Sequence, residues 1–385
     1  MVTPWAPPPL TGRPHCSPEF FGGRRGVACA DASCGVEGDL ESVADGVVGA
    51  GGPAPSRLCG SSLDAAMAAA RIVETGDARV VPAGGVESMT RAPWVVPKPS
   101  RAYPADDLTA VSTTLGRRLV NPKMPAEWTI SLGECNEQLT DTFRISRERQ
   151  DVFAVRSHQL ADAAWRAGHY DTLVISVPGT QLDRDEGIRA SSTREKLATL
   201  KPSFRPGGTI TAGNASPLSD GASTLVIGSE KASDEIGAAP LARIAGRGVH
   251  ALTPQDFGVA PVEAAEAALT RAGIGWDRVG AVELNEAFAA QSLACIDAWD
   301  VDPGIVNTWG GAIALGHPLG ASGGRILGTL AHRLVAERKR WGLAALQLLL
   351  DVFGGCVSRL QLTELSRRSG VSKISTHLLA QKLFR

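Results

Sequence analysis

The chain has 385 residues, and 39 basic side chains against 40 acidic ones leave a net charge of −1. Hydrophobic residues make up 43% of the chain and charged residues 21%, which is close to ordinary globular usage. This balance excludes a nucleic-acid-binding protein that relies on bulk positive charge, and it gives no electrostatic signal for a membrane surface. The length allows one large domain or two to three ordinary ones.

The cysteines argue for a reducing compartment. Their number is odd and their spacings match neither a disulfide framework nor a zinc site, so we expect no metal. Residues 1–10 lack the pattern of a signal peptide, and the longest apolar stretch, 341–350, is too short to span a bilayer. We therefore expect a cytoplasmic protein. The seven cysteines are Cys16, Cys29, Cys34, Cys59, Cys135, Cys295 and Cys356.

The chain divides into three regions of different texture. Residues 1–55 are rich in Pro, Gly, Arg and Ala and have no sustained period of 2 or 3.6, so we expect a segment outside the main fold, with disorder as one option. Residues 57–346 alternate between β-rich runs and helical patterns. Residues 347–385 have apolar positions compatible with a helix, but their pattern differs from that of the middle region.

Short β-rich runs in the middle region each end at a turn-forming residue. We predict strands at 79–82, 172–177, 223–227 and 279–284. Strand–helix alternation with near-continuous apolar strands predicts an α/β fold with a largely parallel sheet, covered by helices on both faces. Residues 90–130 and 178–210 are rich in Pro and charge, and we interpret them as an inserted loop region.

Helices are predicted between these strands. An Ala-rich helix spans 65–73, and a second helix begins after Ser146, a suitable N-cap, with Phe153, Leu160, Ala161 and Ala164 on one face. A third has Pro261 in its first turn and ends at Gly273. In a fourth, one face is formed by Phe288, Cys295, Ile296 and Trp299.

Cys59 is the first candidate for chemistry, because it directly precedes the Ala-rich helix. A thiol at a helix N-terminus meets the positive end of the dipole and free N–H groups, and both favour the reactive thiolate. The small residues Gly60, Ser61 and Ser62 leave room for a substrate. A buried structural cysteine is an equally open interpretation of this local pattern.

His317 and Asn285 are further candidates. His317 lies in a Gly-rich segment where a ligand could approach the imidazole, and a neutral histidine is the natural base for a thiol near pH 7. Asn285 follows a predicted strand; it is either the N-cap of the next helix or a group that holds a water or an oxyanion at the strand end.

Five short motifs follow one another along the chain, and three of them contain the candidate residues Cys59, Asn285 and His317. They are RLCGS (57–61), GGVESM (84–89), AGNAS (212–216), NEAFA (285–289) and GHPLGASG (316–323). On these motifs the chain resembles the thiolase family, whose enzymes cleave or form 3-oxoacyl-CoA. The resemblance covers about residues 57–346, which is 290 of 385 residues.

The resemblance implies a fold and a domain division. The family fold has five layers, αβαβα, in two similar halves, with a loop domain inserted into the first. Here the halves correspond to 56–238, with the loop domain at about 90–210, and 239–346, and both ends of the fold are expected to be incomplete. The segments 1–55 and 347–385 do not match the family, and they resemble sequence from another reading frame or a wrong gene model.

The resemblance also implies roles for individual residues. Cys59 corresponds to the nucleophile that becomes acylated, His317 to the imidazole that activates it, and Asn285 to the residue that holds an oxyanion-site water. CoA and acyl-CoA are the expected substrates, no cofactor is expected, and family members are usually homodimers or homotetramers. The expected CoA contacts are Ser216, Leu132, Ala287 and Phe288.

One family residue is missing. Thiolases carry a second cysteine, after a Gly-Leu-Ala-x-Leu string, that moves the α-proton during C–C bond making or breaking. Here residues 342–346 match that string, but Gln347 follows, and an amide does not take up a proton near neutral pH. Cys356 lies nine residues further on, too far for the placement that catalysis needs.

Two functions therefore compete. The first is a thiolase-type acyltransferase working through acyl-Cys59, and the alternative is an impaired thiolase relative that binds acyl-CoA or serves as a partner subunit. A decarboxylating 3-oxoacyl synthase is disfavoured, because the motifs around Asn285 and His317 resemble thiolase. Residues 131–134 stand where acetoacetyl-CoA thiolases have His-Met-Gly, which favours a degradative enzyme for longer 3-oxoacyl-CoA, as in fatty-acid β-oxidation, or a 3-oxoadipyl-like substrate.

Overall fold

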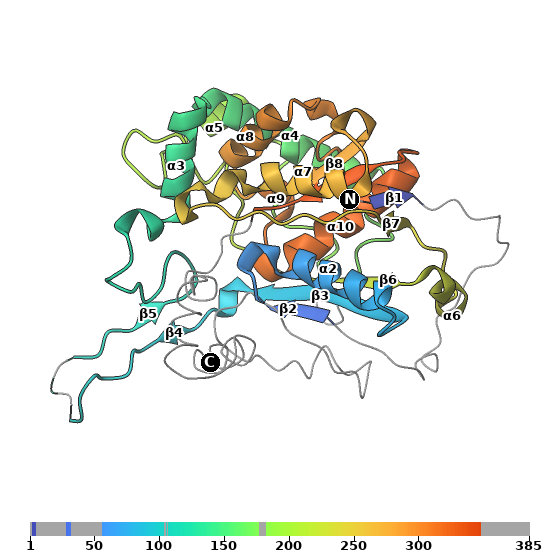
Figure 1. The fold of residues 1–385 in the computed structure, drawn as a ribbon. Helices are drawn as coiled ribbons and strands as arrows, with labels where there is room; N and C mark the ends of the chain where they lie inside the picture. Colours follow the sequence, from blue (N-terminus) through green and yellow to red (C-terminus); the bar gives the residue numbers. More distant parts are fainter. Residues whose placement is uncertain are drawn as a thin grey trace. The chain divides into compact units, whose positions relative to one another are not determined.

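The computed structural model describes residues 2–4, 28–31, 56–103, 105, 107–176 and 182–347 (Figure 1). Predictions for Cys16, Cys34, Val177 and Cys356 therefore lie outside the described residues, as does nearly all of 347–385. Within 1–55 the structure describes two short strands, Val2–Pro4 (β1) and Ala28–Asp31 (β2). No helix in the described ranges is long and apolar enough to cross a membrane.

One sheet has three strands in the order β2-β3-β6, where β3 is Val80–Ser88 and β6 is Asp220–Gly228. β2 is parallel to β3, and β6 is antiparallel to it over the full length of both strands. The strand predicted at 79–82 thus continues through the glycines that were expected to end it. A Cβ atom at Gly84 would lie 2.1 Å from the carbonyl oxygen of Ser223, so the close approach of β6 explains the glycine there.

The second sheet has four strands in the order β7-β1-β9-β8. Its further strands are Ala242–Ile244 (β7), Ala281–Leu284 (β8) and Gly342–Ala345 (β9). β8 and β9 are parallel, whereas β1 is antiparallel to both β7 and β9. The prediction of a largely parallel sheet is wrong, since both sheets are mixed. Neighbouring strands are parallel when a single crossover helix connects them. Here long inserts such as 89–219 connect neighbouring strands, and they allow antiparallel pairing.

Two helices lie between the sheets (Figure 1). They are Ser61–Glu74 (α2) and Leu319–Ala336 (α10). α2 packs on the three-stranded sheet, and α10 contacts strands of both sheets. Buried alanines of α2 meet leucines of α10 in one core cluster, and small side chains allow this close packing. The cluster includes Ala65, Ala66, Ala69, Leu327, Leu330 and Leu334.

Three helices pack over the other face of the four-stranded sheet. They are Arg147–Arg166 (α4), Ala260–Ala272 (α7) and Ala289–Trp299 (α8), and their side chains share a core cluster with Leu284 and Leu343. The predicted boundaries at Ser146 and Gly273 are confirmed: the Ser146 hydroxyl accepts from Arg149 N–H, and Gly273 has φ +68°. Because α8 begins at Ala289 after the N-cap Phe288, the prediction of Asn285 as an N-cap is wrong.

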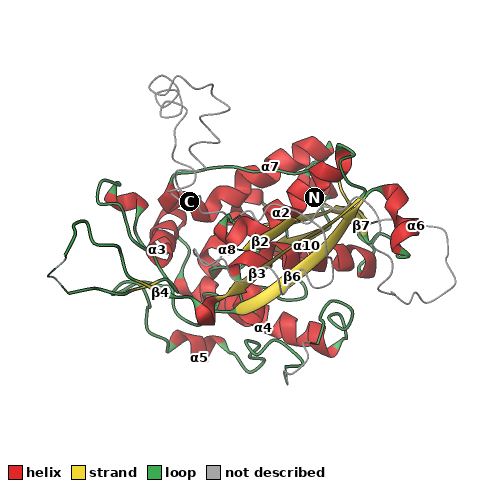
Figure 2. Cartoon of the chain, turned by 90° about the horizontal axis from the view of Figure 1, so that it is seen from below, coloured by secondary structure: helices red, strands yellow, loops and turns green. Residues whose placement is uncertain are grey.

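The inserted region carries smaller elements. A two-stranded ribbon pairs Trp94–Val95 (β4) with Val111–Ser112 (β5), and the helix Arg194–Ala198 (α5) follows later (Figure 2). Leu132–Phe143 (α3) packs on α8, while Ser233–Ile236 (α6) and Ala312–Leu315 (α9) are single turns. The strand predicted at 172–177 is wrong for 172–176, which form a turn and an unpaired segment in which Ile175 is exposed.

The described residues give four alternating layers, from the α4, α7 and α8 helices to the three-stranded sheet. Residues of β6 that point away from α10 are exposed, among them Val226, and no described helix covers that face. The fifth layer expected for the family fold is therefore not formed by the described residues.

A buried arginine joins α10 to the four-stranded sheet. Arg333 is fully buried and donates to the Glu283 carboxylate at 2.7 Å and to the carbonyl of Val282 at 2.9 Å. It also pairs with Glu337 at 2.9 Å. Removal of one member of such a network leaves a buried charge without its partner.

We predict that Arg333→Leu lowers the free energy of unfolding by about 3–5 kcal/mol, because Glu283 then remains buried without its counter-ion. Urea denaturation at pH 7 measures this change. The matched control is Arg194→Leu, which removes an exposed pair with Glu148 and should cost at most about 1 kcal/mol. Equal effects of the two substitutions would contradict the stabilising role of Arg333.

Candidate active site

Cys59 lies in a 3-10 turn, Leu58–Gly60, that leads directly into α2. Leu58 has φ +50°, an uncommon conformation for this residue type. The Ser61 side chain stabilises the turn: its hydroxyl donates to the Leu58 carbonyl at 2.6 Å and accepts from Arg57 N–H at 2.8 Å. The turn leaves the Cys59 side chain buried at the N-terminal end of the helix.

His317 lies just before α10, whose N-terminal part is pressed against that of α2. A Cβ atom at Gly323 would lie 2.3 Å from the backbone nitrogen of Leu63, and Gly324 N–H donates to the Ser62 hydroxyl at 2.9 Å. This close approach brings His317 Nε2 to 3.2 Å from Cys59 Sγ, across 258 residues of sequence.

The hydrogen bonds of Ser322 determine the tautomer of His317. The Ser322 hydroxyl donates its single proton to the Pro318 carbonyl at 2.9 Å. Its oxygen lies 2.6 Å from His317 Nδ1 and therefore accepts from an Nδ1–H group. Nε2 then carries the lone pair, and it accepts from the Cys59 thiol. The imidazole is thus oriented to take the proton of Cys59.

Asn285 completes the group of three predicted catalytic residues. It follows the last residue of β8, and its side-chain Nδ2 donates toward His317 Nε2 at 3.3 Å. Its own backbone N–H donates to the Ala345 carbonyl of β9 at 3.0 Å. The structure therefore places Cys59, His317 and Asn285 together at the carboxyl end of two parallel strands.

Burial makes the resting pair neutral. It raises the pKa of the Cys59 thiol to about 12, with a smaller contribution from the negative charge of Glu87. Burial, together with the positive charge of Arg325, lowers the pKa of His317 to about 3. Burial thus opposes the thiolate that the helix N-terminus favours, and it has the larger effect on the pKa of Cys59. Formation of a thiolate at Cys59 would therefore need a base, and His317 Nε2 is in hydrogen-bond contact with its sulfur.

Glu286 is a supporting residue that the sequence pattern did not single out. Its buried carboxylate accepts from the Ser157 hydroxyl at 2.6 Å, from Asn307 Nδ2 at 2.7 Å and from Ile313 N–H at 3.2 Å. These bonds tie the segment before His317 to the end of β8. The only signal in the sequence was its place next to Asn285 in the NEAFA motif.

Glu87 is a second supporting residue that lies within a motif. It is at the end of β3, is buried, and accepts from Gly320 N–H at 3.0 Å in the first turn of α10. A carboxylate is favourable at this position because the helix dipole is positive there. Glu87 thus stabilises the helix start that follows His317.

The four expected CoA contacts also lie together. Ser216 donates to the Ala287 carbonyl from its N–H at 3.0 Å and from its hydroxyl at 3.1 Å. Leu132, Ala287 and Phe288 pack in one apolar cluster with Ile210. Whether this cluster binds CoA stays a prediction.

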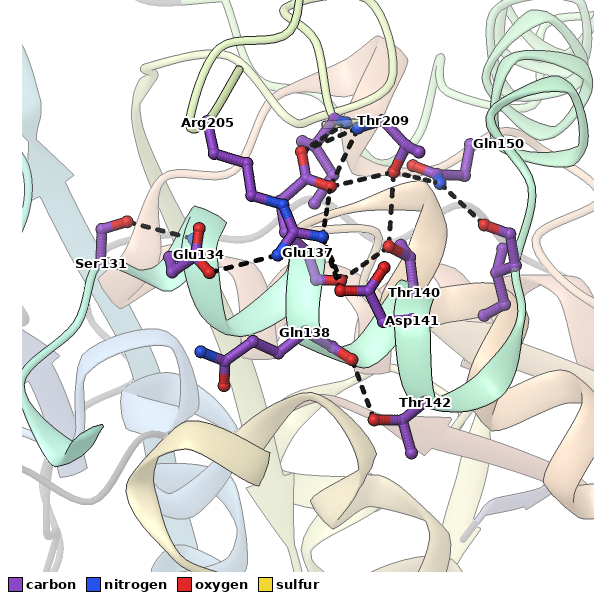
Figure 3. A network of polar contacts seen from close by, with 12 residues as sticks. Ser131, Glu134, Glu137, Gln138, Thr140, Asp141, Thr142, Gln150, Arg205 and Thr209 are labelled. Carbon is purple, nitrogen blue, oxygen red and sulfur yellow. Dashed lines mark hydrogen bonds and ion pairs between the residues drawn. The ribbon is translucent and has the colours of Figure 1, made fainter. Parts of the chain in front are cut away.

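A polar network holds α3 beside this cluster (Figure 3). The fully buried Glu137 carboxylate accepts from the N–H groups of Thr209 and Ile210, each at 2.9 Å. Arg205 adds an ion pair with Asp141 at 2.6 Å. Because Leu132 begins α3, the network fixes its position relative to the 210–216 segment.

Gln347 lies two residues beyond β9 and is fully buried. Neither its Oε1 nor its Nε2 has a hydrogen-bond partner within the described part of the chain. Cys135 and Cys295 are both buried and free. Within the described residues no group of three acidic, histidine or cysteine side chains is arranged to hold a metal.

We predict that Ser322→Ala slows alkylation of Cys59 by iodoacetamide at pH 7 about tenfold. Without the Ser322 oxygen, Nδ1–H loses its acceptor and the tautomer with a free Nε2 is no longer favoured, which removes part of a general-base effect of ~10²–10⁴. Mass mapping of the Cys59 peptide gives the rate. The exposed Ser191→Ala is the control, and an unchanged rate in Ser322→Ala would contradict the assigned tautomer.

The neutral pair also predicts a pH dependence. Since the pKa of Cys59 is raised to about 12, its thiolate fraction should keep growing with pH, and alkylation should still accelerate from pH 8 to pH 10. An ordinary thiol, with a pKa near ~8.5, levels off within this range. The measurement is the alkylation rate of the Cys59 peptide as a function of pH. A rate that is already constant above about pH 7 would contradict the neutral pair and indicate a thiolate–imidazolium pair.

Two family models match the chain. "Thiolase, N-terminal domain" matches residues 53–231, and "Thiolase, C-terminal domain" matches residues 238–348. Together they cover more than half of the chain, and they leave residues 1–52, 232–237 and 349–385 unmatched.

Curated relatives agree with this match. The chain is 40% identical over 300 residues to a β-ketoadipyl-CoA thiolase of Pseudomonas putida, covering 76% of this chain and 75% of the relative. It is 41% identical over 301 residues to the 3-oxoadipyl-CoA/3-oxo-5,6-dehydrosuberyl-CoA thiolase of Escherichia coli, with the same coverage. A probable acetyl-CoA acetyltransferase of Mycolicibacterium smegmatis is 39% identical, covering 76% of each chain.

Solved structures share the fold. The Bacillus anthracis acetyl-CoA acetyltransferase superposes with a TM-score of 0.77 at 32% identity, covering 87% of this chain and 86% of that one. Human mitochondrial 3-ketoacyl-CoA thiolase in complex with CoA gives 0.76 at 32% identity, covering 86% and 85%. On its motifs, its site and these matches, the chain belongs to the thiolase family of acyltransferases.

Proposed function

We propose that this chain cleaves or forms 3-oxoacyl-CoA through an acyl-Cys59 thioester, with His317 as the base. The observation that carries the proposal is the 3.2 Å contact between Cys59 Sγ and His317 Nε2, the ring nitrogen that carries the lone pair. A buried thiol needs such a base, because its own pKa leaves almost no thiolate near neutral pH.

The first step is attack of Cys59 Sγ on the 3-oxo carbon of the substrate. The thiol proton passes to His317 Nε2, the C–S bond forms, and the C–C bond breaks to leave the carbanion of an acetyl-CoA unit. In the second step the thiol of CoA attacks acyl-Cys59, releases a shortened acyl-CoA and restores the Cys59 thiol. Asn285 lies where it can position an oxyanion-site water beside His317.

The proton balance closes without a second cysteine. One proton leaves Cys59 in the first step and one is needed by the carbanion, so protonated His317 can return it to the departing acetyl unit. Gln347 cannot take part, because a side-chain amide neither binds nor releases a proton near neutral pH. His317, whose Nε2 lies 3.2 Å from Cys59 Sγ, is a titratable group and can carry the proton.

The substrate class follows from the relatives. Several similar curated proteins are named β-ketoadipyl-CoA or 3-oxoadipyl-CoA thiolases, which supports 3-oxoacyl-CoA, including the 3-oxoadipyl type, as substrate here. CoA binding is supported by the related human structure with CoA. The relatives do not favour the alternative of an impaired partner subunit. A place in fatty-acid β-oxidation, a cytoplasmic location and a homodimer or homotetramer stay predictions.

We predict that acetoacetyl-CoA places one acetyl group on Cys59, and that CoA then releases it as acetyl-CoA. Cys59→Ala should abolish both the labelling and the CoA-dependent cleavage, because Cys59 is the nucleophile in contact with Nε2, the ring nitrogen of His317 that can take its proton. Intact-protein mass and loss of acetoacetyl-CoA absorbance measure the two events.

Cys295→Ala is the matched control, since Cys295 is also buried but packs in the core cluster of α8 with Trp299. It should retain labelling and cleavage. Labelling that persists in Cys59→Ala, or cleavage without any acyl-enzyme, would contradict the proposed route.

A further inference from the structure

Three buried polar atoms at the carboxyl ends of β8 and β9 have no hydrogen-bond partner within the described part of the chain. They are Oδ1 of Asn285 and both Oε1 and Nε2 of Gln347, and the two side chains are at most 1% exposed. A buried polar group without a partner costs about 1–3 kcal/mol. Native proteins usually satisfy such groups, and ordered water is a common partner.

The strand register places these atoms at one edge of the sheet. Leu284 of β8 lies opposite Ala345 of β9, and Asn285 N–H donates to the Ala345 carbonyl at 3.0 Å. Gln347 is two residues further along, so its Cα lies within about 7 Å of that of Ala345. Asn285 Nδ2 in turn lies 3.3 Å from His317 Nε2. Both amides therefore belong to the edge at which Cys59 and His317 meet.

The two amides can hydrogen-bond a water molecule, but they cannot remove a proton from the α-carbon of a substrate. Removing an α-proton requires a group that can bind it, and Gln347 has none. A water molecule needs two to four polar partners, and the amide oxygens of Asn285 and Gln347 and the His317 lone pair are acceptors of this kind. The Gln347 Nε2–H group remains free to donate to the carbonyl oxygen of a thioester, on which negative charge develops during attack.

We propose that this chain also transfers the acyl group of acyl-Cys59 to water, so that it hydrolyses acyl-CoA, with the amides of Asn285 and Gln347 holding the attacking water. The inference rests on the acyl-Cys59 intermediate of the proposed function. Acyl-CoA and the Cys59 thiol first give acyl-Cys59 and CoA. Water then attacks the thioester carbon and His317 takes one of its protons. The C–S bond breaks, and that proton returns to sulfur, leaving a carboxylic acid and the free thiol.

The test uses acetyl-CoA without any acceptor thiol. Released CoA is followed with a disulfide reagent, and acetyl-Cys59 is followed by intact-protein mass. The chain should give a burst of CoA, equal to the acylated sites, and then steady release. In Gln347→Met, which keeps the side-chain length but lacks the amide, the burst should remain and the steady rate should fall at least tenfold. Gln347→Cys should lose the steady rate in the same way.

Each steady rate is divided by the burst amplitude, which measures the acylated sites. Unfolded protein in a variant therefore does not lower the normalised rate. The control is Gln138→Met on the exposed side of α3, which should hydrolyse acetyl-CoA at the unchanged rate. A burst followed by stable acetyl-Cys59 overturns this inference alone, as does an unchanged steady rate in Gln347→Met. Absence of any acetyl-Cys59 overturns both this inference and the proposed function.

Discussion

The contact between the N-terminal parts of α2 and α10 is the constraint on which the site depends. Gly323 has no room for a side chain against the backbone of Leu63, and Gly324 N–H is bound to the Ser62 hydroxyl. Each helix begins next to one reactive residue, Cys59 or His317. Because the helices meet at their beginnings, the two side chains meet as well, and the sheets on either side remove them from water.

Removal from water changes the chemistry of the pair. A helix N-terminus favours a thiolate, but burial disfavours any isolated charge, and here burial is the larger effect. The site instead stores a neutral thiol beside a neutral imidazole whose tautomer Ser322 determines. Charge then develops only when a substrate carbonyl is present to receive the electrons of sulfur, where Asn285 and a bound water can stabilise it.

Support for this arrangement comes from two buried carboxylates, Glu286 and Glu87. Glu286 binds the segment before His317 to the end of β8, and Glu87 binds the first turn of α10 after it. Both are buried and hydrogen-bonded by groups from other elements, so each fixes one side of the His317 loop. Gln347 differs from them because its amide is buried just beyond β9 without a described partner.

The sequence by itself determined the family and singled out the residues of the proposed site. Five short motifs in order identified Cys59, His317 and Asn285, and local rules located the helix boundaries at Ser146 and Gly273. Such features depend on residues within one turn or one loop, so neighbours in the sequence suffice to predict them. The replacement at Gln347 was equally visible, because it stands directly after a motif.

Tertiary structure decided what depends on contacts between distant segments. β3 continues through Gly84 because β6, about 140 residues later, pairs with it along its full length. The strand predicted at 172–177 fails for its described part because no neighbouring strand pairs with it. The neutral state of Cys59, the tautomer of His317 and the roles of Glu286 and Glu87 follow from burial and from partners up to 258 residues away, which no local pattern contains.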